Sequence, residues 1–284
     1  MAQIMDGKAV ASEVKLEVKE QVARLKMQYN VTPGLAVILV GDDPASAIYV
    51  RNKQKACDEV GIYSRTFSFA ADVEQKELEI LITELNRNPQ YNGILIQMPL
   101  PKPLDARALI NLIHPDKDVD GLVPFNMGRL MIGEQALYPC TPLGIMILLQ
   151  RYSIPISGAH AVIVGRSNLV GKPLSLMLLA ANATVTVCHT KTKQLSEIVK
   201  QADILVAAAG KRGLINGEWI KTGAVVIDVG TNRTETGKLT GDVEFEQAEK
   251  RASFITPVPG GVGPMTIAML LKNTLAATER QIRS

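Results

Sequence analysis

At 284 residues the chain is long enough for about two domains, and its composition, 46% hydrophobic and 21% charged, is that of an ordinary globular protein. The net charge of +3 comes without a basic run, which gives no case for nucleic-acid binding, and no run of about 18 apolar residues exists to cross a membrane. The three cysteines, Cys57, Cys140 and Cys188, are too widely spaced for a zinc or disulfide motif, so we expect a reducing, cytoplasmic location.

The first elements along the chain alternate between helix and strand. Apolar residues recur every three or four positions between Val10 and Leu25, which predicts an amphipathic helix. The unbroken apolar run LAVILV predicts a strand buried on both faces, as in parallel sheets. Asp43 then predicts the N-terminus of a second helix, which Gly61 ends. The alternation continues with a strand over 62–69, a helix over 73–87 and a strand over 93–97.

A second series of elements begins near residue 140, after the proline-rich MPLPKPL, the polar loop at 114–121 and a less regular stretch that extends to about residue 138. A helix is expected from Thr141, followed by strands over 160–164, 184–188, 203–209 and 224–230, by helices near 171–181 and 193–200, and by a last helix near 264–280. The two series predict an α/β protein of two domains. The first has a parallel sheet and covers 1–140, with the helix at 265–284 packed back on it, and the second is a Rossmann-type domain over 141–264.

The stretch VIVGRSNLVGKP joins a predicted strand to a predicted helix. Gly165 ends the strand, and the next glycine begins the helix; in such a frame, free backbone N–H groups and the helix dipole can bind phosphate. A glycine-tolerant turn without a ligand explains these glycines equally well. After the next strand, however, HTKT has no acidic residue for the ribose hydroxyls of NAD, whereas Arg166 and Thr190 could bind a 2′-phosphate. The pattern therefore favours NADP over NAD.

Three polar residues of the first domain are candidates for chemistry. Tyr49 and Lys53 are four apart on a predicted helix and share a face. One interpretation is a solvated lysine beside a half-buried tyrosine. The other is a desolvated lysine whose pKa falls, so that its neutral amine takes a proton near pH 7. Gln97 ends a buried strand, where open α/β sheets bind ligands, although an ordinary strand exit fits as well.

Two loops complete the set of candidates. DKDVDG resembles a calcium loop but lacks the glycine and distal glutamate of an EF-hand, so no metal site is expected. Asp116 and Asp118 fit a solvated loop, while Asp120 could accept hydrogen bonds from a ligand's amino and ring N–H groups. PVPGGVGPMT, rich in glycine and proline before the last helix, suits close approach of the backbone to a ligand, or else a rigid interdomain turn.

Together, YVRNK, GILIQMPLP, DKDVDG, VGRSNLVGKP and PGGVGPMTI resemble the bifunctional methylenetetrahydrofolate dehydrogenase/methenyltetrahydrofolate cyclohydrolase family, in matching order and over nearly the whole chain. The resemblance implies NADP-dependent oxidation of 5,10-methylenetetrahydrofolate to 5,10-methenyltetrahydrofolate, followed by hydrolysis to 10-formyltetrahydrofolate. It also implies a folate site between the domains and a homodimer. The expected place is in one-carbon metabolism, which supplies purine, histidine and methionine biosynthesis.

The resemblance also implies roles for individual residues. Lys53 would handle protons in the hydrolysis, and Gln97 would hydrogen-bond it and favour its neutral form. Asp120 would hold the pterin, while Tyr49 would pack against the folate. The other folate contacts would be Ile96, Met98, Pro259, Gly260, Gly261, Val262, Gly263, Pro264 and Thr266. The NADP contacts would be Gly165, Arg166, Ser167, Thr190 and Thr231.

Three positions depart from the family pattern. Met98 stands where leucine is usual, Leu122-Val123 replaces an aromatic–histidine pair, and Thr231 stands where an apolar residue often lies near the nicotinamide. The last makes Thr231 the weakest of the cofactor contacts. Two alternatives remain: a non-catalytic NADP-binding sensor, and a dehydrogenase without cyclohydrolase activity. The presence of Lys53 together with Gln97 favours the bifunctional enzyme.

Overall fold

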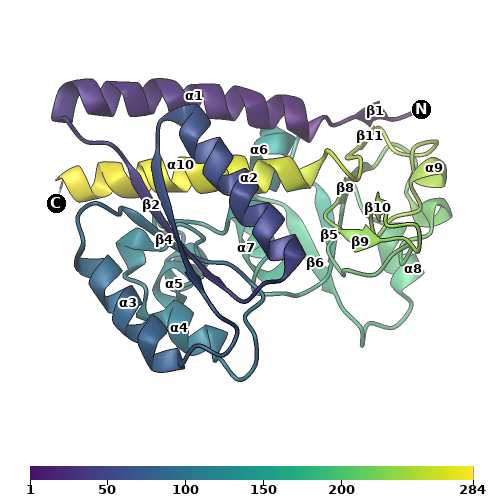
Figure 1. The fold of residues 1–284 in the computed structure, drawn as a ribbon. Coiled ribbons are helices and arrows are strands. Elements are labelled where there is room, and N and C mark those ends of the chain that lie inside the picture. Colours follow the sequence, from purple (N-terminus) through teal and green to yellow (C-terminus); the bar gives the residue numbers. More distant parts are fainter. Residues whose placement is uncertain (284) are drawn as a thin grey trace. The chain divides into compact units, whose positions relative to one another are not determined.

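The computed structural model describes residues 1–283, and the chain divides into two compact units (Figure 1). The six-stranded unit comprises residues 1–11 and 141–266. The three-stranded unit comprises residues 12–140 and the chain from Ile267 onward. The chain thus passes from one unit to the other three times, after Ala11, after Cys140 and after Thr266.

The three-stranded unit is built on a parallel sheet. Its strands are β2 (Gly34–Val40), β3 (Tyr63–Phe69) and β4 (Gly93–Ile96), in the order β3-β2-β4. The central strand is almost wholly buried, as the unbroken apolar run predicted. Its residues Ala36, Ile38 and Val40 face a core that α3 and α4 complete.

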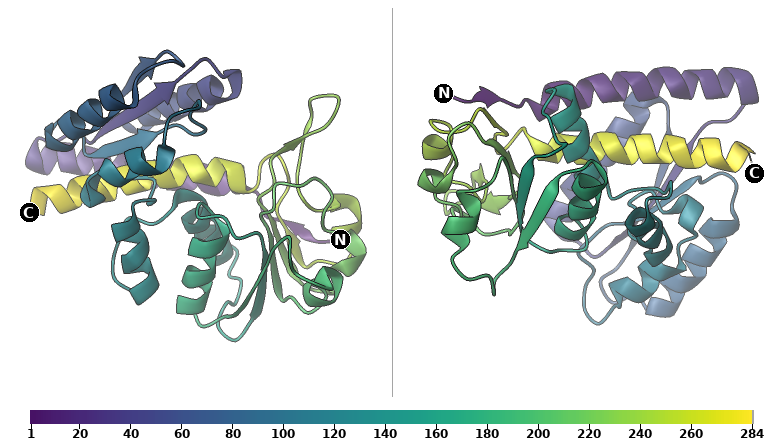
Figure 2. Two further views of the ribbon diagram at one scale, coloured as in Figure 1. Left: turned by 90° about the horizontal axis from the view of Figure 1, so that it is seen from below. Right: turned by 180° about the vertical axis from the view of Figure 1, so that it is seen from behind.

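The helices of the three-stranded unit enclose its sheet. They are α1 (Gly7–Tyr29), α2 (Pro44–Val60), α3 (Gln75–Arg87), α4 (Ala106–Leu112), α5 (Pro124–Ile132) and α10 (Val262–Arg283), with a 3₁₀ turn η1 (Pro115–Lys117). The first residues of α1 and α10 belong to the six-stranded unit. The two long helices lie side by side and run in the same direction (Figure 2). Among the helices of residues 1–283, none combines the length and apolar character that a membrane crossing requires.

The six-stranded unit has a parallel sheet in the order β1-β11-β8-β7-β5-β6. Its strands are β1 (Gln3–Ile4), β5 (His160–Val164), β6 (Thr184–Cys188), β7 (Ile204–Ala207), β8 (Val225–Asp228) and β11 (Phe254–Ile255). Its helices are α6 (Cys140–Arg151), α7 (Gly171–Ala180), α8 (Leu195–Val199), α9 (Phe245–Ala248) and the 3₁₀ turn η2 (Gly217–Trp219), and β9 (Asn232–Arg233) pairs antiparallel with β10 (Leu239–Thr240).

The predicted α/β fold with two parallel sheets is confirmed, with corrections to individual elements. The stretch from 122 to 138 is not irregular, because it contains α5, and α4 was not predicted. Asp105 caps α4 by accepting from the backbone N–H of Arg107 at 2.9 Å, and Pro124 occupies the first turn of α5. The strand β1 was not predicted either, because two residues carry no periodicity and their partner β11 is distant in the sequence.

Candidate active site

Helix α2 carries Tyr49 and Lys53 one turn apart. As predicted, Asp43 caps this helix by accepting from the backbone N–H of Ser46 at 2.8 Å, and Gly61 ends it in the left-handed region at φ 83°. The side chain of Lys53 is half-buried, whereas that of Tyr49 is exposed. The helix therefore directs the lysine toward the sheet and leaves the tyrosine ring on the surface.

Gln97, the residue after β4, meets Lys53. The Lys53 Nζ donates to Gln97 Oε1 at 2.9 Å, and Gln97 Nε2 donates to the Met98 carbonyl at 2.7 Å, so both ends of the amide are fixed. An amide oxygen that accepts from nitrogen stabilises an ammonium at least as well as an amine. The hydrogen bond therefore fixes the position of the nitrogen and does not by itself favour the neutral form, which corrects the expectation for Gln97.

Desolvation governs the charges around Lys53. Burial lowers the pKa of Lys53 below its ordinary value, and the nearby Asp120 carboxylate opposes that shift. Burial raises the pKa of Asp120, against the opposing effects of Lys53 and of a hydrogen bond from Cys140. Both shifts favour the neutral form, so desolvation outweighs the attraction of the two groups. The result is an amine able to take up a proton closer to neutral pH than a solvated lysine.

Asp118 shapes the segment that carries Asp120. Its side chain is 1% exposed and accepts from the backbone N–H groups of Leu122 at 3.1 Å and Val123 at 2.8 Å. It also accepts from Asn126 Nδ2 at 2.9 Å, which links the segment to α5. Asp118 is thus not a solvated loop residue, as the acidic pattern had suggested, but an organiser of the turn that follows Asp120.

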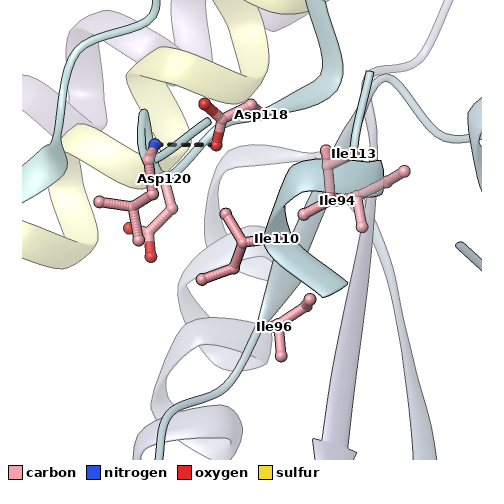
Figure 3. A pocket seen from close by; sticks show the side chains of 7 residues that line it. Ile94, Ile96, Ile110, Ile113, Asp118 and Asp120 are labelled. Atoms are coloured by element: carbon pink, nitrogen blue, oxygen red, sulfur yellow. Dashed lines mark hydrogen bonds between the residues drawn. The ribbon is translucent and has the colours of Figure 1, made fainter. Parts of the chain in front are cut away.

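A small pocket opens beside Asp120 (Figure 3). It is lined by Ile94, Ile96, Ile110, Ile113, Asp118, Asp120 and Leu122. The dashed line in Figure 3 marks the hydrogen bond that the Asp118 carboxylate accepts from the backbone N–H of Leu122. The Asp120 carboxylate points away from Asp118. The pocket is too small to hold a fused ring, so what it shows is a set of apolar side chains beside the Asp120 carboxylate, a pairing that suits contact with a group that presents N–H donors.

The glycine turn after β5 has the geometry of a phosphate cradle. Gly165 has a φ of +133°, and a Cβ on it would come within 2.1 Å of the Ala208 carbonyl oxygen. A Cβ on Gly171 would likewise meet the Gly165 carbonyl oxygen at 2.1 Å, so close chain packing excludes larger residues at both positions. Between them Ser167 Oγ accepts from the Val170 N–H at 3.1 Å, immediately before α7 begins.

The loop after β6 lies beside this cradle. The Gly165 N–H donates to the Cys188 carbonyl at 2.9 Å, which brings the two loops together. Arg166 and Thr190 are both exposed here, and residues 189–192 contain no acid. The residues present therefore fit an anionic group on the ribose better than free ribose hydroxyls.

Thr231 is exposed in a segment that two buried carboxylates hold. Asp228, 4% exposed, accepts from the Gly230 N–H at 2.9 Å, and Asp242, 0% exposed, accepts from Asn232 Nδ2 at 2.8 Å. Burial raises the pKa of Asp228 to about 6. The sequence patterns gave no sign of this pair, because its two members come from separate segments.

The glycine-rich segment at 257–266 packs against the start of α1. A Cβ on Gly7 would come within 1.7 Å of the Gly261 carbonyl oxygen, and the Lys8 N–H donates to the Gly260 carbonyl at 3.1 Å. At the end of the segment, the hydroxyls of Thr266 and Thr141 lie 2.9 Å apart. The segment therefore belongs to the six-stranded unit, together with the glycine turn.

The structure thus groups the predicted residues by unit. Lys53, Gln97 and Asp120 come together in the three-stranded unit, while Tyr49 projects from the same helix as Lys53. The remaining predicted residues of the three-stranded unit are Ile96 and Met98, and those of the six-stranded unit are Gly165, Arg166, Ser167, Thr190, Thr231, Pro259, Gly260, Gly261, Val262, Gly263, Pro264 and Thr266. Within residues 1–283, no three His, Cys, Asp or Glu side chains are placed to hold a metal ion.

Two family models match the chain. Residues 5–120 match the catalytic domain of tetrahydrofolate dehydrogenase/cyclohydrolase, and residues 139–282 match its NAD(P)-binding domain. The chain belongs to the tetrahydrofolate dehydrogenase/cyclohydrolase family. It is therefore a bifunctional enzyme with dehydrogenase and cyclohydrolase activities and an NAD(P)-binding domain, as the motifs predicted, and the alternative of a non-catalytic sensor is disfavoured.

Members of the family match this chain over its full length. The "Bifunctional protein FolD" of Moorella thermoacetica is 58% identical over 279 residues, which are 98% of this chain and 99% of the relative. The crystal structure of the FolD methylenetetrahydrofolate dehydrogenase/cyclohydrolase from Campylobacter jejuni has a TM-score of 0.97 at 48% identity, covering 99% of this chain and 100% of that one. The Trypanosoma brucei FolD, solved with NADP cofactor and an inhibitor, has a TM-score of 0.95 at 42% identity, covering 100% and 99%.

Proposed function

We propose that the three-stranded unit hydrolyses the folate and that the six-stranded unit holds the cofactor for the oxidation. The substrate is 5,10-methylenetetrahydrofolate, which is converted to the 5,10-methenyl compound and then to 10-formyltetrahydrofolate. When bound, NADP⁺ supplies the acceptor for the hydride that the methylene carbon loses. One observation carries the proposal: the amine of Lys53, its pKa lowered by burial, is held 2.9 Å from the Gln97 amide oxygen.

Lys53 handles the protons of the hydrolysis. Its neutral amine takes a proton from the water whose oxygen attacks the methenyl carbon. The ammonium then gives this proton to N5 of the pterin as the bond between that carbon and N5 breaks. The remaining hydroxyl proton leaves to solvent, so the formyl group stays on N10 and one proton is released overall. Because the substrate is itself a cation, its binding disfavours the ammonium and acts in the same direction as burial. Gln97 keeps the nitrogen in place throughout.

The folate is held through both polar and apolar contacts. Asp120 accepts hydrogen bonds from the amino and ring N–H groups of the pterin, and Ile96, which lines the small pocket beside Asp120, adds an apolar contact. Tyr49 packs against the folate, and Met98 adds an apolar contact beside Gln97. The other folate contacts are proposed at Pro259, Gly260, Gly261, Val262, Gly263, Pro264 and Thr266.

The cofactor is held by the glycine turn and the neighbouring loop. The backbone of Gly165 and the side chain of Ser167 bind its phosphates at the N-terminal side of α7. Arg166 and Thr190 bind the 2′-phosphate, and Thr231 contacts the nicotinamide. The absence of any acid in residues 189–192 supports a preference for NADP over NAD.

We further propose a homodimer that forms through the sheet of the six-stranded unit. Strand β6 ends the order of that sheet, and Val187 on it is 37% exposed. Leu179, on the helix that precedes this strand, is 59% exposed. A sheet edge with exposed apolar side chains suits pairing with a second copy of the chain.

The expected location is the cytoplasm, where the product supplies one-carbon units for purine, histidine and methionine biosynthesis. The three cysteines support a reducing compartment, because Cys57, Cys140 and Cys188 are all free and buried.

The test is an absorbance spectrum recorded over time with the purified protein, 5,10-methylenetetrahydrofolate and NADP⁺. We expect NADPH to form without lasting methenyl absorbance, because hydrolysis follows oxidation at the same protein. In Lys53→Met, which removes the amine and keeps an apolar side chain of similar length, we expect the methenyl compound to accumulate or both steps to be lost.

The other outcomes separate the alternatives. Formation of NADPH with persistent methenyl absorbance in the unaltered protein would indicate a dehydrogenase without cyclohydrolase activity. No turnover with NADP⁺ or with NAD⁺ would reject the enzyme assignment for this chain.

A further inference from the structure

The position of the Asp120 carboxylate depends on the backbone segment that carries it. Residues from other parts of the chain hold that segment in place. Gly121, the next residue, has a φ of +70°, and a Cβ there would come within 2.4 Å of the Tyr138 carbonyl carbon and 2.5 Å of the Pro139 nitrogen. Residues 119–121 therefore lie against residues 138–140 in direct backbone contact. Whatever joins these two backbones also determines where Asp120 lies.

One side chain, Asn273 on α10, joins both backbones. Its Nδ2 donates to the Val119 carbonyl at 2.8 Å and to the Tyr138 carbonyl at 2.8 Å. The same nitrogen lies 3.6 Å from the Sγ of Cys140, and this sulfur lies 3.3 Å from the Val119 carbonyl oxygen. The side chain of Asn273 is only 4% exposed, and its bond to the Val119 carbonyl is buried while that to the Tyr138 carbonyl is partly buried. All of these residues belong to the three-stranded unit.

The geometry requires a primary amide. A single nitrogen with two N–H groups reaches two carbonyls that come from different segments, whereas aspartate or leucine of similar shape has no donor. Removing the amide leaves the buried Val119 carbonyl with only the Cys140 thiol nearby and the partly buried Tyr138 carbonyl without this donor, which is costly. The neighbouring hydroxyl of Thr274 bonds instead to the Leu270 carbonyl of its own helix at 2.8 Å and does not serve the loops.

We propose that Asn273 is a positioning residue for the folate reactions, fixing Asp120 both for the pterin and at its distance from Lys53. The proposal rests on the function proposed above. It assigns a part in the site to a residue of α10 that lies beyond the PGGVGPMTI motif and that the sequence motifs did not indicate. Asn273 acts through the carbonyls of Val119 and Tyr138 and touches no reacting atom.

The test compares Asn273→Ala and Asn273→Ser with Gln281→Ala in the full-length protein. Gln281 is a matched control, because its Nε2 also joins two carbonyls from α10, those of Asn92 at 2.9 Å and Asp116 at 3.0 Å, without contacting the Val119–Gly121 segment. Each alanine variant removes one side-chain amide that bridges two backbone segments. A change in KM that came only from lost stability would therefore appear in both variants. The readouts are KM and kcat for each substrate and the pH profile of the cyclohydrolase step.

We expect Asn273→Ala to raise KM for the folate by roughly tenfold or more while KM for NADP⁺ stays unchanged, since a small misplacement of a binding group is costly. The limb of the pH profile that reports Lys53 should move to lower pH, because a displaced Asp120 no longer raises the pKa of the amine. Asn273→Ser, which keeps one donor, should show a smaller change. Gln281→Ala should lower the melting temperature without changing either KM.

An unchanged folate KM and pH profile in Asn273→Ala, or equal changes in Gln281→Ala, would overturn the proposal. If Asn273→Ala does not fold, the same readouts in Asn273→Ser test the proposal. Binding of tetrahydrofolate, measured by calorimetry, separates this proposal from the proposed function. If the unaltered protein shows no turnover, the proposed function fails, while a weaker affinity for tetrahydrofolate in Asn273→Ser still supports the positioning role and an equal affinity rejects it.

Discussion

The surroundings of Lys53 support the chemical role that we propose for it. Its amine is held by Gln97 and lies near the Asp120 carboxylate, yet burial has the largest effect on its pKa. If the ion pair dominated, the pKa of the amine would rise and that of the acid would fall; both move the other way. The amine is therefore prepared to take up a proton before any substrate arrives.

This balance predicts the effect of Asp120→Asn on Lys53. Removing a carboxylate that raises the pKa of the amine leaves burial less opposed, so the pKa of Lys53 should fall further and its neutral fraction at pH 7 should rise. The ¹³Cε chemical shift of Lys53, followed against pH without substrate, measures this directly. Lys53→Arg assigns the resonance. An unchanged or higher pKa of Lys53 in Asp120→Asn would contradict the inference that the Asp120 carboxylate opposes the effect of burial on this amine.

The sequence predicted the residues whose spacing is local and missed those whose partners are distant. Tyr49 and Lys53 are four apart on one helix, and Gln97 ends an apolar strand, so both patterns are visible along the chain. Asn273 meets the Val119 carbonyl across 154 positions, and no periodicity records such a contact. Asp118 was assigned to solvent because acidic character is visible in a sequence, whereas the backbone donors that satisfy it are not.

At the scale of elements, α5 was missed although it carries a proline in its first turn and a glycine at its C-terminal end. Its apolar residues Phe125, Met131 and Ile132 are exposed, so the pattern of buried positions that identifies a helix is obscured. Gly128 inside the helix weakens the signal further. By contrast, α3 buries Leu78, Ile82 and Leu85 at helical spacing and was predicted to within two residues.

Two glycines of α5 give a paired prediction about that element. A Cβ on Gly128 or on Gly133 would meet nothing within 4 Å, but Gly133 has a φ of +77°. Gly128→Ala should therefore raise the free energy of unfolding by about 0.5–1 kcal/mol, and Gly133→Ala should lower it by about 1 kcal/mol. Urea unfolding of both variants measures the difference. If the free energy of unfolding changed in the same direction in both variants, packing and not backbone conformation would determine the effect of alanine at these positions.

At the scale of the whole molecule, each unit is assembled from two separate stretches of chain. Helix α10 supplies Leu271 to the three-stranded unit, and β7 supplies Leu205 to the six-stranded unit. The side chains of Leu271 and Leu205 are 0% and 1% exposed, so alanine at either position removes the same buried atoms and leaves a cavity in the core of its unit. They are therefore suited to asking how far the two units unfold independently.

Leu271→Ala and Leu205→Ala should each cost about 2–5 kcal/mol, through lost burial and the cavity left behind. Hydrogen exchange followed by mass spectrometry should show the first change reducing protection mainly in β2 and the second mainly in β5 and β8. Binding of NADP⁺ should persist in Leu271→Ala. Equal loss of protection in both units for each variant would instead mean that the molecule unfolds as one cooperative body.

The pairing of β1 with β11 has a consequence for synthesis on the ribosome. Residues 3–4 are made long before their partners at 254–255, which follow about 250 residues later along the chain. At typical elongation rates the strand waits roughly 10 to 50 seconds without its neighbour. The unit that contains Lys53 waits longer still, since it requires the helix that carries Asn273. A nascent chain that stalls before Asn273 is made therefore lacks a segment of the three-stranded unit, to which we assign the hydrolysis.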